Sequence, residues 1–298
     1  MARTFSIITT CKGRLEHLKK SLPTMVAQSC DEVIVVDYSC PEGTGDFVTK
    51  NFPSVRLVSV PGQDHFSNWK ARNAGAAVAT SNVLIFVDAD TLLADGAIEW
   101  IAAHLPPRTF GFFDSKTSRA FNRDGPRVAA NQLKGFQIIP AAAFQRAEGY
   151  DEVLEGYAAG ADTDLEIRLS MIGLRRRPLD SSIVESVIQH DASSRTAHHA
   201  QPIASSYAAG LLYRAAKRVL LKMNRRAELP IGMRRNLYRA AAHAARTLGP
   251  KRGRVMMNVR LSEEPILMPR QLGFERGQQR VSLHLEISME DALKEPVA

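Results

Sequence analysis

The stretch VLIFVDAD, residues 83–90, runs five strand-forming apolar residues directly into two aspartates, Asp88 and Asp90. A short apolar run of this kind predicts a buried strand in a parallel sheet that is covered on both faces. The two carboxylates then leave the carboxyl end of that strand, where open α/β folds bind their ligands. The stretch therefore predicts both a sheet and the edge at which a site would lie.

This Asp-Ala-Asp (DxD) pair can hold a hard divalent cation such as Mg²⁺ or Mn²⁺, which leaves positions open for the oxygens of a substrate diphosphate. Such chemistry favours a nucleotide sugar as the ligand. A structural interpretation competes with it, because an Asp before Thr91-Leu92-Leu93 is also an ordinary helix start. The motif taken alone leaves both interpretations open.

Strand and helix patterns alternate along residues 1–200. The predicted strands cover residues 5–10, 32–36, 55–60, 83–87, 110–114 and 135–139, and the predicted helices cover residues 14–27, 43–51, 67–79, 96–104, 141–146 and 163–171. Such alternation predicts an α/β fold with a mostly parallel, doubly wound sheet.

The composition is that of a globular protein, with 45% hydrophobic and 23% charged residues in a chain of 298. No apolar run approaches the roughly 18 residues that span a bilayer, and the first residues lack the features of a signal peptide. We therefore expect a cytoplasmic protein. The spacings of Cys11, Cys30 and Cys40 match no zinc motif, so we expect reduced structural thiols.

The net charge of +8 comes from one segment. Residues 206–260 carry fourteen Lys and Arg against one acid, Glu228. Two amphipathic helices are predicted there, at residues 206–226 and 233–247, and short strands are expected in the last forty residues. Such a basic segment suggests an anionic membrane, an acidic partner or nucleic acid, or simply a solvated helix face.

The first of these helices is expected to present an apolar face and a basic face. The apolar face comprises Leu212, Ala216, Val219, Leu220 and Met223, and the basic face comprises Arg214, Lys217, Arg218, Lys222, Arg225 and Arg226. This composition fits peripheral contact with an anionic bilayer. Packing on the rest of the protein is an equal alternative, and nucleic acid is less favoured because few aromatic residues are interleaved.

Six segments in a fixed order carry a family resemblance. They are IITTCKGR (7–14), VIVVDYS (33–39), NWKARNAG (68–75), VLIFVDAD (83–90), KGFQIIPAAAFQRAEGYDE (134–152) and GADTDLEIRL (160–169). Together they resemble the inverting, metal-dependent GT-A glycosyltransferases of family 2, and the later segments are similar to the carboxyl-terminal part of the β-1,4-galactosyltransferases. The resemblance covers about residues 4–192.

The resemblance implies roles for residues at the strand ends. Thr9 and Asp37 would bind the nucleotide base, and Arg72 would assist at the base or the phosphates. Asp88 would face the ribose and the metal, and Asp90 would be the principal ligand of Mn²⁺ or Mg²⁺.

Further along the chain, the resemblance makes Asp162 the catalytic base and His190 an imidazole ligand of the metal. Two positions depart from the family pattern. Ala161 stands where relatives have Glu, a residue that often contacts the acceptor, and Val187 stands where the galactosyltransferases have a Met ligand.

Structural roles compete with some of these assignments. Arg72 could be a helix-surface arginine, Asp162 could cap the helix that follows, and His190 could be structural. Asp164 and Arg168, four residues apart, are expected to form a helix-surface ion pair.

We therefore expect residues 1–200 to form a GT-A catalytic domain and residues 201–298 a helical extension. The expected activity is an inverting hexosyl or N-acetylhexosaminyl transfer from a nucleotide-diphosphate sugar, UDP-linked, to a glycan, lipid-linked or peptide acceptor. Two other functions stay open: a nucleotide-binding scaffold whose site has decayed, and a nucleic-acid binder that uses residues 206–260.

Overall fold

The fold was analysed in a computed structural model that describes residues 2–113, 133–156, 159–189, 197–199, 203–224, 226–248, 254–266 and 277–288. The chain divides into two compact units. The first comprises residues 1–152 and 161–200, and the second comprises residues 153–160 and 201–298. Residues 153–160 thus fall in the second unit, although we expected them in the catalytic domain.

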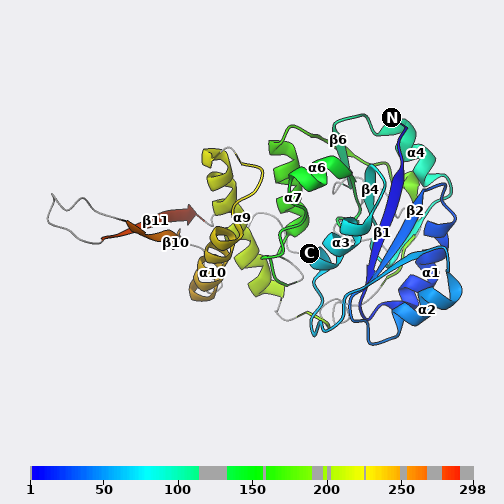
Figure 1. The fold of residues 1–298 in the computed structure, drawn as a ribbon, viewed down its shortest axis with the longest axis horizontal. Coiled ribbons are helices and arrows are strands. Elements are labelled where there is room, and N and C mark those ends of the chain that lie inside the picture. Colours follow the sequence, from blue (N-terminus) through cyan, green and yellow to red (C-terminus); the bar gives the residue numbers. More distant parts are fainter. Residues whose placement is uncertain are drawn as a thin grey trace. The chain divides into compact units, whose positions relative to one another are not determined.

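The first unit is built on a seven-stranded sheet with the strand order β3-β2-β1-β4-β7-β6-β8. The strands are β1 (Phe5–Cys11), β2 (Glu32–Asp37), β3 (Arg56–Ser59), β4 (Val83–Phe86), β6 (Thr109–Phe112), β7 (Gln137–Pro140) and β8 (Arg175–Pro178). All neighbours are parallel except β7, which is antiparallel to both β4 and β6. The predicted α/β fold with a mostly parallel sheet is confirmed (Figure 1).

Helices connect and flank these strands. They are α1 (Leu15–Val26), α2 (Thr44–Asn51), α3 (Asn68–Val78), α4 (Ala97–His104), α6 (Ala141–Arg146) and α7 (Ala161–Met171). Helix α1 buries Leu15, Leu18, Leu22 and Met25, which recur every three or four residues and so lie on one face. Strands β1, β2 and β4 are almost entirely buried, as their apolar runs predict.

A small second sheet follows the two aspartates of the DxD motif. It pairs β5 (Thr91–Leu93) with β9 (Val184–Val187), which follows the 3-10 turn η1 (Ser181–Ile183). The expectation that an Asp here starts a helix is therefore wrong, because Thr91–Leu93 is a strand. The amide of Ile188 donates to the carbonyl of Asp90 at 2.8 Å, so the end of β9 lies beside the motif.

The second unit contains helices α9 (Ile203–Asn224) and α10 (Ile231–Leu248) and strands β10 (Arg254–Ile266) and β11 (Gly277–Ser288). The two helices pack on each other, and the rings of Tyr213 and Tyr238 are edge to face with their centroids 5.7 Å apart. The strands form one antiparallel hairpin. Our expectation of short strands was wrong, because β10 and β11 have 13 and 12 residues.

The charged and apolar residues of α9 are not arranged as the two expected faces. Lys217 is completely buried and forms an ion pair of 2.6 Å with the buried Glu228, the one acid of the segment. By contrast, Val219 and Met223, which we expected on the packed face, are 45% and 71% exposed. No helix among the described residues is long and apolar enough to span a membrane.

Candidate functional site

The two aspartates that follow β4 lie at the carboxyl edge of the sheet. The side chain of Asp88 keeps 29% of its surface exposed, and Asp90 is partly buried. Burial raises the pKa of Asp88, the negative charge of Asp90 raises it further, and the Arg72 guanidinium opposes both effects. A cation held by both carboxylates would relieve this repulsion, so the pair suits a hard divalent ion.

Arg72, on α3, joins Asp88 to a carboxylate that is distant in sequence. Its Nη2 donates to Asp88 at 2.6 Å, and its Nη1 lies 3.1 Å from the hydroxyl of Tyr150 and 3.4 Å from Asp162. The arginine is 1% exposed, so the helix-surface interpretation is wrong. Gly135 allows this packing, because a Cβ there would lie only 2.1 Å from an Asp88 oxygen.

Asp162 is the second residue of α7, inside the helix, which is not the position of an N-cap. The helix amino terminus and the guanidinium of Arg72 both favour its negative charge. Burial nevertheless dominates and raises the pKa of Asp162 to about 6, with Asp88 and Glu166 acting in the same direction. A carboxylate whose pKa lies near neutrality can accept a proton more readily than an ordinary Asp.

A buried chain of hydrogen bonds extends from this centre. Tyr150 donates to Gln137 at 2.7 Å, Gln137 donates to Glu166 at 3.2 Å, and Arg176 pairs with Glu166 at 2.7 Å. We had not predicted this chain. The one signal in the sequence is Glu166 four residues after Asp162, which places both on one face of α7.

The residues expected to bind the base lie at the ends of β1 and β2. Asp37 accepts the amides of Cys40 at 2.8 Å and Gly45 at 2.9 Å, so its carboxylate orders the loop before α2. The hydroxyl of Thr9 is fully buried and has no hydrogen-bond partner among the described residues. Its neighbour Thr10 faces the other side of the sheet and donates to Asn68 at 2.9 Å.

Lys12, which the sequence did not single out, is 6% exposed and ties three loop carbonyls together. Its ammonium donates to Ser39 at 2.8 Å and Gln63 at 2.6 Å, and lies 3.4 Å from the carbonyl of Tyr38. The loops after β1, β2 and β3 are thus held by a single cation beside the predicted base-binding residues.

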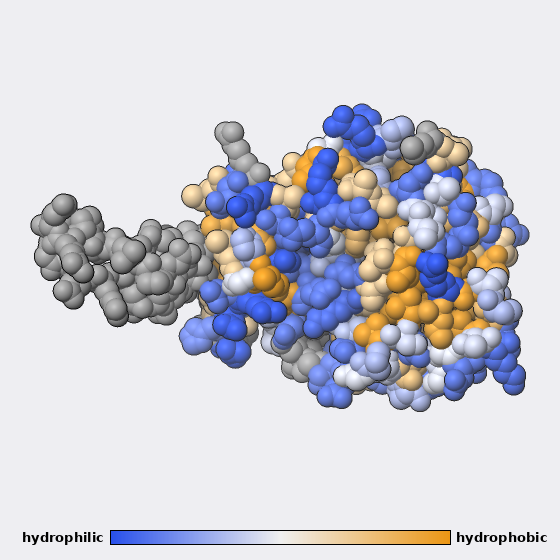
Figure 2. Space-filling model, viewed as in Figure 1, coloured by the Kyte–Doolittle hydropathy of each residue, from blue (hydrophilic) through white to orange (hydrophobic). Residues whose placement is uncertain are grey.

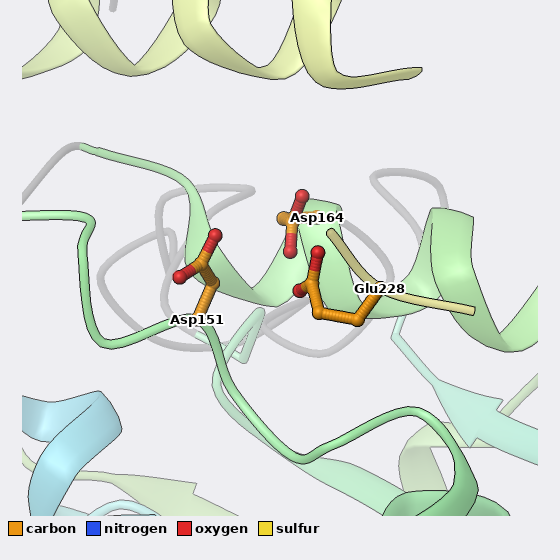
Figure 3. A group of neighbouring side chains, drawn as sticks. All are labelled: Asp151, Asp164 and Glu228. Atoms are coloured by element: carbon orange, nitrogen blue, oxygen red, sulfur yellow. The ribbon is translucent and has the colours of Figure 1, made fainter. Parts of the chain in front are cut away.

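Asp164 and Arg168 form the predicted i, i+4 ion pair at 2.7 Å, but not on the helix surface. Their side chains are 5% and 0% exposed. Asp151, also buried, turns its carboxylate toward Asp164, with oxygens within 4.8 Å (Figure 3). Arg168 already supplies a positive charge to this pair, which points to a structural role. Figure 3 also draws Glu228, which belongs to the second unit.

The proposed metal ligand His190 lies outside the described residues. Val187, at the position of the galactosyltransferase Met, is a buried strand residue paired with Thr91. Because Ile188 bonds to Asp90, the chain passes beside the DxD motif two residues before His190.

Comparisons with known proteins point to a family for the amino-terminal half. Residues 6–132 match the family model described as Glycosyl transferase family 2. The matched segment covers less than half of the chain. It contains Asp37, Arg72, Asp88 and Asp90 but ends before Asp162. A sequence comparison with curated proteins finds no match.

Solved structures with a similar fold include residues 1–349 of S. aureus TarS, at 15% identity and a TM-score of 0.55, covering 83% of this chain and 72% of that one. The complex of TarS with UDP-GlcNAc has 14% identity, a TM-score of 0.58 and coverages of 83% and 73%. A Pyrobaculum calidifontis mannosyltransferase, PcManGT, in complex with GDP-Man and Mn²⁺, has 15% identity, a TM-score of 0.51 and coverages of 84% and 77%. The predicted GT-A fold is therefore confirmed.

The expected likeness of the later segments to the β-1,4-galactosyltransferases is not among these findings. The family match and the fold together support a nucleotide-sugar glycosyltransferase.

Proposed function

We propose that the protein transfers a sugar, with inversion, from a nucleotide-diphosphate sugar to an acceptor hydroxyl. One observation carries the proposal: Arg72 joins Asp88, at the end of β4, to Asp162, at the start of α7. A carboxylate with a raised pKa thus lies beside a carboxylate pair that suits a cation. A proton acceptor and a diphosphate-binding centre are the two parts that this reaction needs.

In this proposal, Asp162 accepts the proton of the acceptor hydroxyl as that oxygen attacks the anomeric carbon. The sugar develops oxocarbenium-like charge, and negative charge grows on the departing diphosphate. Asp88 and Asp90, with His190, would hold the divalent ion, which when bound neutralises the diphosphate. Arg72 fixes the relative positions of Asp88 and Asp162.

The donor is proposed to be UDP-linked, with a hexose or N-acetylhexosamine. TarS is solved with UDP-GlcNAc, but PcManGT is solved with GDP-Man, so both nucleotides belong in the test. The glycan, lipid-linked and peptide acceptors remain proposals of equal standing. A decayed nucleotide-binding scaffold is the competing function, because Ala161 and Val187 replace residues that relatives use.

The test is a thermal-shift screen of UDP- and GDP-sugars with Mn²⁺, followed by a hydrolysis assay with those that bind. A ligand specific for the folded state raises Tm, by an amount that follows its concentration relative to Kd. Binding together with hydrolysis supports the transferase. Binding without hydrolysis or transfer would support the scaffold, and no binding by any donor would overturn both.

We predict that donor binding and turnover require a divalent cation, with Mn²⁺ preferred over Ca²⁺. The proposed ligands are two carboxylates and the imidazole of His190, and such a set would favour a transition metal. The measurement is donor hydrolysis after chelation by EDTA, compared with the same sample after Mn²⁺ is restored. Undiminished activity in excess EDTA would rule out this role for Asp88 and Asp90.

We also propose that the second unit contacts anionic membranes through the region where α9 ends and α10 begins. The exposed apolar residues of this unit include Val219, Met223 and Ile231, which are 45%, 71% and 45% exposed. The exposed basic residues of the two helices are Arg218, Lys222, Arg235, Arg239 and Arg246, and Arg226 in the connection between the helices is also exposed. Figure 2 shows hydrophobic residues between hydrophilic ones on this unit.

No acid offsets these charges on the two helices, because Glu228 is buried against Lys217. Apolar residues interspersed with basic ones are typical of segments that lie in a membrane interface. Lipid-linked acceptors would be presented at such a surface.

We predict that the protein sediments with liposomes that contain anionic lipid, and that binding falls steeply between about 0.05 and 0.5 M salt. Lys222→Glu changes the net charge by two, and each charge near the surface contributes roughly 1 kcal/mol. This change should therefore weaken binding by on the order of twentyfold. Lys50→Glu, an exposed charge reversal on α2, is the matched control. Protein that stays in the supernatant at low salt would contradict the proposal, and binding to DNA with the same salt dependence would favour the nucleic-acid alternative.

A further inference from the structure

Cys11 and Cys40 meet where β1 ends and the loop after β2 begins. Cys11 is completely buried, whereas Cys40 is partly exposed. The amide of Gly13 donates to the Cys40 sulfur at 3.2 Å, and the hydroxyl of Thr44 donates to the Cys11 sulfur at 3.2 Å. The two side chains also influence each other's pKa, which means that they are neighbours.

This arrangement distinguishes the two sulfurs chemically. The Cys11 thiol, Thr44 and the backbone amides of Glu42 and Gly13 lower the pKa of Cys40 to about 5, although burial opposes them. The pKa of Cys11 shifts in the opposite direction, because its interaction with Cys40 and its burial raise it. Cys40 is therefore a partly exposed thiolate, and Cys11 is a buried thiol.

We propose that Cys40 is a peroxide-sensitive modification site with Cys11 as its resolving thiol. The Cys40 thiolate attacks one oxygen of the peroxide and the O–O bond breaks, so that a sulfenic acid forms and the other oxygen leaves, with a proton from solvent, as an alcohol or water. The Cys11 sulfur then attacks the sulfenic sulfur, the S–O bond breaks, and the hydroxide leaves as water with the Cys11 proton. Two thiols are oxidised by two electrons to a disulfide, and one peroxide is reduced.

The modification falls on the loop that holds Asp37. The amide of Cys40 donates to the Asp37 carboxylate at 2.8 Å, and Lys12, next to Cys11, binds the carbonyl of Ser39. A covalent link between Cys11 and Cys40 would therefore change the position of Asp37, the predicted base-binding residue. This consequence for the donor rests on the proposed function, whereas the thiol chemistry does not.

The first test is alkylation of the intact protein by iodoacetamide at about pH 6.5, followed by peptide mapping. Cys30, partly buried with a pKa that burial raises, is an internal control in the same chain. Almost all of Cys40 but only about 1% of an ordinary thiol is ionised at this pH, and the lower nucleophilicity of a weakly basic thiolate offsets part of the difference. We expect Cys40 to react roughly tenfold faster than Cys30.

The second test is treatment with hydrogen peroxide, followed by non-reducing peptide mapping. We expect the peptides of Cys11 and Cys40 to be joined, with the loss of two hydrogen atoms, and to separate again with dithiothreitol. Cys11→Ser should leave Cys40 as a sulfenic acid that dimedone traps. Equal alkylation of Cys30 and Cys40, or no joined peptide in the wild-type protein, would overturn the proposal, and neither result depends on the transferase activity.

Discussion

Asp162→Asn is expected to abolish most sugar transfer while donor binding stays nearly intact. The amide keeps the shape of the carboxylate but cannot accept the acceptor's proton. A general base contributes on the order of 10²–10⁴ in rate, so kcat should fall by that factor. The measurement is kcat with the best donor from the screen, beside the donor's Kd. Retention of more than about a tenth of the turnover would contradict the role of Asp162 as base.

The same residue predicts how activity depends on pH. A base must be ionised to act, so kcat should fall as the pH drops through about 6, the raised pKa of Asp162. Asp95→Asn, an exposed carboxylate change, is the matched control and should leave both kcat and its pH profile unchanged.

As the pH rises through this range, the stability of the fold should fall while the activity rises. The pKa of Asp162 is higher in the folded protein than the usual value, so its contribution to stability is present below the unfolded pKa and is lost as the pH rises through about 6. Above that pH, the buried charge costs roughly 3 kcal/mol, by about 1.4 kcal/mol per pKa unit. Asp162→Asn should therefore keep or raise Tm at about pH 8, and a clear loss of Tm would mean that the ionised form stabilises the fold.

Arg72→Ala is expected to have the largest effect on stability. It removes the cation between Asp88 and Asp162 and leaves two carboxylates near each other without it. Loss of one partner from a buried ion pair costs about 3–5 kcal/mol, which corresponds to roughly 10 °C in Tm for a domain of this size. The measurement is thermal unfolding at neutral pH.

Lys70→Ala is the control for this change, because Lys70 lies on the same helix and is exposed. Arg72→Lys keeps the charge but not the planar fork, so it should recover only part of the lost Tm. The donor-binding role that the family resemblance implies for Arg72 predicts a different result: a weaker donor Kd with an unchanged Tm.

Local patterns in the sequence were enough to predict the strands β1, β2 and β4. Their apolar runs end in polar residues, and parallel strands expose their carboxyl ends at one edge, so Asp37 and Asp88 could be placed there in advance. The antiparallel direction of β7 was beyond such patterns. Strand direction depends on which neighbours the strand finds in the sheet, and a period of two residues carries no information about it.

Local patterns also failed to predict which residues of helix α9, in the second unit, are buried. Spacing alone assigned Lys217 to the basic face and Met223 to the apolar face of α9, and the structure reverses both. Lys217 finds Glu228, a partner that lies beyond the end of the helix, and the ion pair compensates for its burial.

The sequence by itself determined the α/β fold and the strand-end position of the DxD pair, because both depend on residues close together in the chain. Tertiary structure alone decided that Arg72 lies between Asp88 and Asp162, which are 74 positions apart in the printed sequence. The pKa of Asp162 follows from that arrangement, since burial and neighbouring charges shift an acid only after folding has brought them together.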